Sequence, residues 1–223
     1  MNIAIDGPAG AGKSPIAKKV AKTLGYIYVD TGAMYRAMAL YMIKLGIDPE
    51  NANAIEEACK SADIGIEYRD GEQVVLLNGE NVNAYLRTEE VGNMASVTSV
   101  NGKVREKLVE LQQKLAKTKD VVMDGRDIGT TVFPHAELKI FMTARDEVRA
   151  KRRFDEMLAK GGNPVYEEVL ANLKERDYID SHRSVSPLRQ ADDAFVLDNS
   201  DMTMKEELSW IMGVIQGKFG ILQ

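Results

Sequence analysis

The chain has 223 residues, of which 44% are hydrophobic and 28% are charged, a composition typical of a folded globular protein and unlike that of a disordered one. Its formal net charge of -5 argues against binding nucleic acid through bulk positive charge, so an anionic ligand would be held by local clusters of basic residues. Cys59 is the single cysteine, which excludes an intramolecular disulfide and a four-cysteine zinc site.

Neither a secretory leader nor a membrane span is predicted. The N-terminal residues lack a basic segment followed by a long apolar run and a cleavage site, and no stretch approaches the ~18 to 20 apolar residues that cross a bilayer. We therefore expect a cytoplasmic protein without a membrane partner.

Taken in chain order, short apolar runs predict five strands, and stretches of helical periodicity lie between most of them. The predicted strands are residues 3–5, 26–29, 121–123, 138–142 and 195–197. The predicted helices are residues 16–24, 34–45, 104–117, 147–159, 167–180 and 205–218. This alternation predicts an α/β fold of three layers, with a mostly parallel five-stranded sheet covered on both faces.

Residues 64–82 interrupt this alternation with extended runs separated by turn residues. Asn78-Gly79 favours a tight hairpin turn, because both residues tolerate positive φ. We predict a small antiparallel meander inserted into the α/β core. A single hairpin remains the alternative, because the turn before Glu72 has the weaker signal.

A phosphate-binding motif follows the first predicted strand and precedes the first predicted helix. Residues 7–14 match G-x-x-x-x-G-K-[ST], in which glycines turn backbone N–H groups onto phosphate oxygens. We expect Lys13 to contact the β and γ phosphates of ATP and the Ser14 hydroxyl to ligate Mg²⁺. The predicted ATP-binding residues of the loop are Gly7, Pro8, Ala9, Gly10, Ala11, Gly12, Lys13 and Ser14.

Pro15 directly follows this loop and has no backbone N–H. Proline also disfavours the helical conformation in the residue before it, here Ser14. One interpretation is that Pro15 sits without consequence in the first turn of a helix. The other is that it removes a donor that would otherwise hold the α-phosphate, and both interpretations stay open.

Two further motifs follow predicted strands, at the sheet edge where ligands of α/β folds bind. Residues 30–36, which read DTGAMYR, would direct the guanidinium of Arg36 at an acceptor phosphate. In residues 124–127, Asp124 is placed to organise Mg²⁺ through water, Arg126 to bind phosphate, and Asp127 to accept a hydrogen bond from a base amino group.

Two basic helices complete the set. Arg176, Asp180 and Arg183 are spaced to share one helical face, and a salt-bridged surface strip is the alternative for them. Residues 149–153 carry a second cluster, Arg149, Lys151, Arg152 and Arg153, before a turn at residues 161–164. That cluster resembles the lid of nucleoside monophosphate kinases, whose arginines close over the transferring phosphate; a solvated run of charges is the alternative.

Together these segments resemble the bacterial cytidylate kinase family. The resemblance rests on the phosphate loop and on residues 30–36, Arg87-Thr88 with Asn93 and Ser96, residues 104–106, 124–127, 176–184 and 186–188. It runs nearly end to end and includes the inserted meander, which in that family enlarges the acceptor-binding region. Pro15, where the family usually has threonine, and Thr31, where some members have serine, are the departures.

The resemblance implies roles for individual residues. Ser96, Arg105 and Asp127 match positions that recognise cytosine, Arg176 and Asp180 match positions at the ribose, and Arg36, Arg126 and Arg183 match the acceptor-phosphate clamp. Thr31 is expected beside the acceptor, and Arg152 and Arg153 beside ATP. The expected catalytic residues are Lys13, Asp124, Arg126 and Arg183.

The reaction expected from the resemblance is Mg²⁺-dependent transfer from ATP to CMP or dCMP, in pyrimidine nucleotide metabolism, by a monomer. We expect one kinase domain over residues 1–223, with a core at 1–60, 101–148 and 184–223, an acceptor-binding region at 61–100 and a lid at 149–183. The alternatives are a kinase for another acceptor such as AMP, and a nucleotide-binding protein weakened in catalysis.

Overall fold

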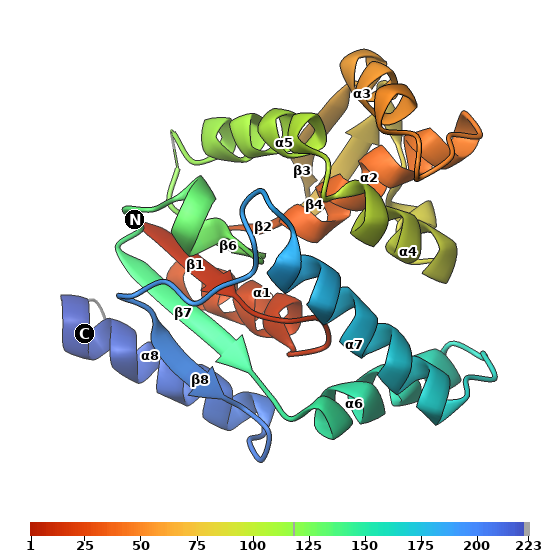
Figure 1. Ribbon diagram of the computed structural model, residues 1–223. Helices are drawn as coiled ribbons and strands as arrows, with labels where there is room; N and C mark the ends of the chain where they lie inside the picture. Colours follow the sequence, from red (N-terminus) through yellow and green to blue (C-terminus); the bar gives the residue numbers. More distant parts are fainter. Residues whose placement is uncertain (118, 221–223) are drawn as a thin grey trace.

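The computed structural model describes residues 1–117 and 119–220, in which strands and helices alternate along the chain (Figure 1). The strands are β1 (Asn2–Asp6), β2 (Ile27–Asp30), β3 (Ile64–Arg69), β4 (Glu72–Leu77), β5 (Glu80–Asn81), β6 (Val121–Gly125), β7 (Leu138–Thr143) and β8 (Phe195–Asp198). The helices are α1 (Lys13–Leu24), α2 (Thr31–Lys44), α3 (Ala52–Ser61), α4 (Glu89–Thr98), α5 (Gly102–Leu115), α6 (Asp146–Ala159), α7 (Tyr166–His182) and α8 (Met204–Phe219). A 3₁₀ turn covers Asn83–Tyr85 and a π-helical turn covers Ile128–Val132.

The main sheet has five strands in the order β2-β6-β1-β7-β8, and every neighbouring pair is parallel. Because parallel strands end at one edge, Asp6, Asp30 and Asp124 gather there, with Asp30 directly opposite Asp124 in the register. The predicted parallel sheet is confirmed, and the phosphate loop leaves it from the central strand β1.

Two apolar cores lie on the two faces of this sheet, as the period-2 alternation of a strand requires. Ile3 and Ile5 of β1 point into a core shared with α1 and α8, while Ala4 points into a core shared with α2 and α5. Each of these three residues is fully buried. The three-layer prediction is therefore confirmed, with helices covering both faces (Figure 1).

The insertion forms a separate antiparallel sheet in the order β3-β4-β5. Both of its turns use positive φ, at Asp70-Gly71 and at Asn78-Gly79. Two consecutive positive-φ residues match the twist of an antiparallel hairpin, which explains why both turns are tight. The predicted meander is confirmed, and the single-hairpin alternative is wrong.

Helices α3 and α4 were not predicted, although each begins at a side-chain cap. Asn51 accepts a hydrogen bond from the Ala54 N–H, and Thr88 accepts one from the Val91 N–H. Helix α4 also carries Glu89 and Glu90 in its first turn, where the helix dipole favours acids. These capping signals are present in the sequence and identify both helix starts.

Helices α6 and α7 form an antiparallel pair joined by the turn predicted at residues 161–164, and this pair borders the edge of the sheet where the phosphate loop lies (Figure 1). No helix within the described residues, 1–117 and 119–220, is long and apolar enough to span a bilayer.

Candidate active site

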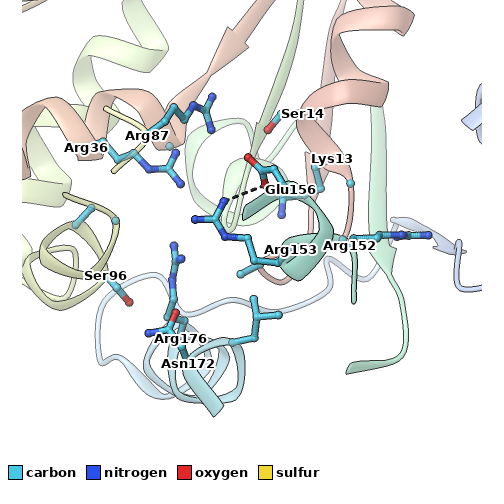
Figure 2. Close-up of a pocket in the computed structure, with 18 of the residues that line it drawn as sticks. Lys13, Ser14, Arg36, Arg87, Ser96, Arg152, Arg153, Glu156, Asn172 and Arg176 are labelled. Atoms are coloured by element: carbon cyan, nitrogen blue, oxygen red, sulfur yellow. Dashed lines mark hydrogen bonds and ion pairs between the residues drawn. The ribbon is translucent and has the colours of Figure 1, made fainter. Parts of the chain in front are cut away.

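A cleft of about 1200 Å³ opens at the carboxyl edge of the main sheet, between the phosphate loop, helices α2 and α4, and the α6–α7 pair (Figure 2). Pockets for one small ligand usually measure ~300 to 1000 Å³, so this cleft has room for two. The predicted residues that line it are Ala9, Gly10, Ala11, Gly12, Lys13, Ser14, Thr31, Arg36, Ser96, Arg105, Asp124, Arg126, Asp127, Arg152, Arg153, Arg176, Asp180 and Arg183. Gly7 and Pro8, the first two residues of the loop, are not among the lining residues.

The shape of the phosphate loop depends on its glycines. A Cβ on Gly7 would lie 2.0 Å from the Met142 carbonyl oxygen of β7, so only glycine fits where the loop leaves the sheet. Gly10 has a φ of +73°, and a Cβ there would lie 3.2 Å from the Cβ of Arg149. The loop is therefore packed closely against both β7 and α6.

Lys13 is buried at the start of α1, and its ammonium donates a hydrogen bond to the Pro8 carbonyl oxygen at 2.7 Å. Burial, together with the positive charge of Arg126, lowers the pKa of Lys13 to about 7. A phosphate placed on the loop would bring negative charge to this ammonium and favour its protonated form.

Pro15 is the third residue of α1, exposed at the rim of the cleft. Helix α1 begins at Lys13 and includes Ser14, so the expectation that Pro15 keeps Ser14 out of the helical conformation is wrong. The preference imposed by a following proline is only a bias, and proline is well tolerated in the first turn of a helix.

Asp124 is held at the end of β6 by three hydroxyl groups. Ser14 donates to one carboxylate oxygen at 2.8 Å and Tyr28 donates to the other at 2.8 Å, while Thr31 donates to the backbone oxygen at 2.7 Å. Burial, with the nearby charge of Asp30, raises the pKa of Asp124 to about 6. Hydroxyl and carboxylate oxygens beside a phosphate loop are the donors that Mg²⁺ prefers, so Ser14 and Asp124 fit that ion.

Arginines gather in the middle of the cleft. Figure 2 shows Arg36, Arg87, Arg153 and Arg176 extending toward a common space from different elements. Burial and the charge of Arg87 lower the pKa of Arg36 to about 10, and burial with the charge of Arg126 lowers that of Arg176. Guanidinium groups that repel one another in this way mark a site for a multiply charged anion.

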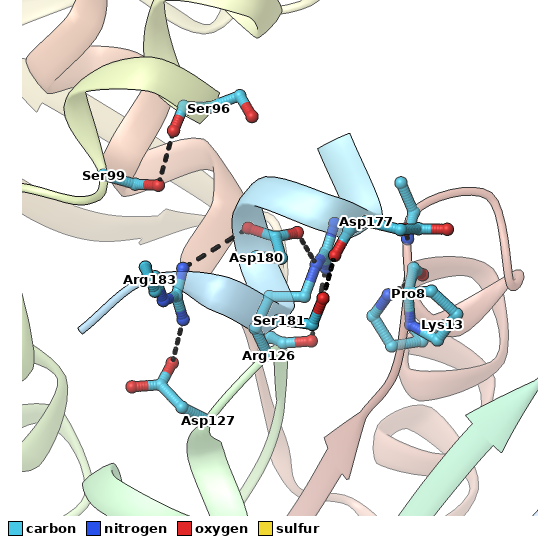
Figure 3. Close-up of polar contacts among 12 residues, drawn as sticks. Pro8, Lys13, Ser96, Ser99, Arg126, Asp127, Asp177, Asp180, Ser181 and Arg183 are labelled. Atoms are coloured by element: carbon cyan, nitrogen blue, oxygen red, sulfur yellow. Dashed lines mark hydrogen bonds and ion pairs between the residues drawn. The ribbon is translucent and has the colours of Figure 1, made fainter. Parts of the chain in front are cut away.

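The far end of the cleft holds a chain of ion pairs (Figure 3). Arg105 donates to Asp127 at 2.5 Å, Arg183 donates to Asp180 at 3.3 Å, and Arg126 donates to Asp180 at 2.8 Å. Arg105 and Asp127 are 2% and 4% exposed, so this pair is shielded from water. These salt bridges fix the direction of each guanidinium group around the pocket.

Four buried polar atoms in this same region find no hydrogen-bond partner among the described residues. They are the Tyr35 hydroxyl, Ser96 Oγ, Arg105 Nε and Arg183 Nη2, the last of which still forms an ion pair with Asp127 at 3.7 Å. All four residues line the cleft, and the Arg105 guanidinium lies 5.3 Å from the Tyr35 ring centroid. Buried polar groups are nearly always paired, so this concentration indicates that a polar ligand completes the pocket.

The basic residues of α6 divide into two groups. Arg153 faces the cleft and pairs with Glu156 at 2.9 Å, whereas Arg152 donates to the Asn199 side chain and backbone at 3.1 and 2.9 Å. Arg149 and Lys151 do not line the cleft. Of the four basic residues in this cluster, the structure therefore brings Arg152 and Arg153 to the cleft, and these are the two expected beside ATP.

Arg87 and Tyr28 are among the residues at the site that had no role in the sequence analysis. Arg87 lines the cleft and pairs with the Asp30 carboxylate at 2.5 Å. Tyr28 reaches Asp124 from the neighbouring strand, two positions before Asp30. The period of a strand places Tyr28 and Asp30 on one face, which is the signal that could have identified Tyr28.

Comparison with protein families gives a consistent result. A family model described as "Cytidylate kinase" matches residues 3–217. The cytidylate kinase of Parabacteroides distasonis is 54% identical over 216 residues, covering 94% of this chain and 94% of the relative. The cytidylate kinase of Caldicellulosiruptor bescii is 51% identical over 212 residues, covering 95% of this chain and 94% of the relative.

Among solved structures, shikimate kinase from Bacteroides thetaiotaomicron aligns with a TM-score of 0.51 and 10% identity. The alignment covers 97% of this chain and 98% of the other. At that identity the similarity shows the shared fold alone.

Proposed function

Because the chain belongs to the cytidylate kinase family, we propose that it transfers the γ-phosphoryl group of ATP to CMP or dCMP, with Mg²⁺, in pyrimidine nucleotide metabolism. It is a nucleoside monophosphate kinase by that membership. We further propose that residues 61–100 serve as the acceptor-binding region and residues 149–183 as the lid, around a core formed by residues 1–60, 101–148 and 184–223.

One observation supports the acceptor assignment most directly: the buried atoms without a hydrogen-bond partner at the far end of the cleft. Leaving a buried polar atom without a partner costs about 1 to 3 kcal/mol, so the free protein carries a penalty that a fitting ligand removes. Cytosine offers two acceptors, the ring nitrogen N3 and the carbonyl oxygen O2, for donors such as Arg105 Nε and Ser96 Oγ. Its 4-amino group is a donor for the Asp127 carboxylate, whereas uracil would present a carbonyl oxygen there.

The donor nucleotide fits the other end of the cleft. Backbone N–H groups of the glycine loop and the N-terminus of α1 favour the triphosphate, with Lys13 beside the β and γ phosphates. The Ser14 hydroxyl and the Asp124 carboxylate would hold Mg²⁺, which supplies positive charge to the phosphate oxygens.

The arginines between the two ends supply positive charge where the phosphoryl group passes. Arg36, Arg126 and Arg183 would orient the acceptor phosphate, and Arg153 approaches from α6. Phosphoryl transfer needs alignment and charge stabilisation more than a strong general base. The α6–α7 pair lines the cleft and would close over it to exclude water, which would otherwise hydrolyse ATP.

A panel of acceptors tests this proposal. Purified protein with Mg²⁺ and ATP should form ADP fastest with CMP and dCMP, more slowly with UMP, and slowest with AMP and GMP. Lys13→Met should abolish the CMP-dependent rate while leaving CMP binding intact. Preferred turnover of AMP would contradict the assignment and support a kinase for another acceptor, and the absence of CMP-dependent ADP formation would support a nucleotide-binding protein weakened in catalysis.

A further inference from the structure

Arg149, in the first turn of α6, is 3% exposed and lies outside the cleft lining. Its Nη1 donates to the Ala9 carbonyl oxygen at 2.8 Å and to the Asp177 carboxylate at 2.6 Å. Its Nη2 donates to Asp146 at 2.6 Å, and its Nε donates to the Ala144 carbonyl oxygen at 3.1 Å. The Arg149 guanidinium group is thus hydrogen-bonded to the phosphate loop, to α7 and to its own helix, α6.

Asp177 completes the contact from α7. One of its carboxylate oxygens accepts the Arg149 hydrogen bond, and the other accepts the Ala9 N–H at 3.2 Å. Both peptide groups of Ala9 are therefore held by side chains of the two lid helices. Figure 3 shows Asp177 extending from α7 toward the loop at Pro8.

Apolar packing supports the same attachment. Ala9 belongs to a small core with Ala150 of α6 and with Val169 and Leu173 of α7. Gly10 packs so closely on Arg149 that an added Cβ would lie 3.3 Å from the Arg149 carbonyl oxygen. The loop is thus part of the core of the α6–α7 pair as well as of the main sheet.

The same helix reaches the acceptor end of the cleft. Arg176 precedes Asp177 directly, and Asp180 lies three residues later, one turn along α7 and bonded to Arg126. A helix segment of five residues moves as a unit. A ligand that draws Arg176 and Asp180 inward therefore moves Asp177, and with it the peptide of Ala9.

We propose that Asp177 and Arg149 are positioning residues that couple the acceptor site to the ATP loop, so that occupation of one site raises affinity at the other. Neither side chain contacts a substrate in this assignment. The inference rests on the proposed function, because it takes ATP and CMP as the two ligands. Coupling between two sites is reciprocal, so it can be measured from either ligand.

Calorimetric titration measures this coupling. CMP is titrated into the protein with and without a non-hydrolysable ATP analogue and Mg²⁺, and the ratio of the two Kd values reports the coupling. Typical coupling corresponds to a factor of about 5 to 150, and we expect wild type to lie in that range. Asp177→Asn keeps the side-chain size but loses the charge, and its ratio should fall to within about twofold of one.

Two further variants sharpen the test. Arg149→Lys keeps the positive charge but loses the fork that binds Ala9 and Asp177 together, so its ratio should fall in the same way. Glu175→Gln removes an exposed acid from the same helix and should keep the wild-type ratio. Amide exchange of Ala9 without ligand gives a second measurement, and it should speed up in Asp177→Asn but not in Glu175→Gln.

The outcomes separate the inference from the function on which it rests. If wild type binds neither CMP nor the ATP analogue, the proposed function fails. If wild type binds both but shows a ratio near one, or if Asp177→Asn keeps the wild-type ratio, the inference alone is overturned. A variant with a lower Tm but an unchanged ratio would assign Asp177 to structure only and would also overturn it.

Discussion

Replacing Ser96 with alanine should stabilise the free protein while weakening CMP binding. Ser96 Oγ is buried near the end of α4 and has no hydrogen-bond partner within residues 1–117 and 119–220. Removing such a group abolishes its desolvation penalty, and alanine is also the better helix former. We expect the free energy of unfolding to rise by about 1 to 2 kcal/mol, or about 2 to 8 °C in Tm for a chain of this size.

The effect on CMP has the opposite sign. If Ser96 donates to cytosine in the complex, the Ser96→Ala complex lacks one neutral hydrogen bond, which is worth about 0.5 to 1.5 kcal/mol. Together with the about 1 to 2 kcal/mol by which the free variant is stabilised, CMP binding should weaken by about 1.5 to 3.5 kcal/mol, so the Kd for CMP should rise by a factor of about 10 to 400. The Kd for an ATP analogue alone should not change, because Ser96 lies at the far end of the cleft from the phosphate loop.

The assay combines calorimetric melting without ligand and titration with CMP. Melting must be done on the free protein, because bound nucleotide would itself raise Tm. Ser99→Ala is the matched control. Ser99 also lines the cleft, but its hydroxyl donates to the Ser96 carbonyl oxygen at 2.9 Å, so its loss should lower Tm (Figure 3).

The two serines therefore predict opposite shifts in Tm from the same chemical change. A Ser96→Ala protein that melts lower than wild type, with CMP affinity unchanged, would refute the reasoning. It would mean that the hydroxyl is already satisfied in the free protein and does not reach the base.

Three other perturbations give separate tests. Tyr28→Phe removes a hydrogen-bond donor from the Asp124 carboxylate. It should raise the Mg²⁺ concentration needed for half-maximal binding of an ATP analogue about tenfold. The control Tyr26→Phe, which lies beside α1, should not change that concentration. Burial raises the pKa of Asp6 to about 6, so between about pH 4 and 6 the folded state keeps a proton that the unfolded state has released. The free energy of unfolding should therefore fall by about 3 kcal/mol as the pH rises from about 4 to 6 in denaturant titrations, and Asp6→Asn should lack this decrease. Pro15→Thr and Pro15→Ala both restore a backbone N–H in the first turn of α1, so each should lower the Kd for ATP about tenfold without changing the Kd for CMP. An unchanged Kd for ATP in both variants would show that the missing donor is irrelevant.

Local patterns predicted the main sheet because each strand is a short apolar run ended by a polar motif. The phosphate loop follows β1, and the Asp124 motif follows β6, so parallel pairing alone brings them to one edge. This is why so many of the predicted residues line one cleft. The insertion was also predictable, since Asn78-Gly79 is a strong turn signal.

Other features required the third dimension. Arg149 and Arg153 are four residues apart on one basic helix, and periodicity cannot tell which of them faces ligand and which is buried against α7. Helices α3 and α4 are only 10 residues long each, and their caps were the clearer signal. The π-helical turn after Asp127 depends on the Asp6 carboxylate, which accepts the N–H groups of Ile128 and Gly129 from 122 and 123 residues away.

The position of the inserted sheet follows from the edge strand β2. An edge strand leaves peptide groups unpaired, and here the insertion satisfies them with side chains. Gln73 of β4 accepts the Asp30 N–H at 2.8 Å and donates to the Asp30 carbonyl oxygen at 3.1 Å, as a neighbouring strand would. The Tyr68 hydroxyl donates to the Tyr28 carbonyl oxygen at 3.1 Å. The insertion thereby takes the place of a sixth strand at the end of β2. It holds Asp30, the residue directly before α2, and so positions the helix that carries Thr31 and Arg36 into the cleft.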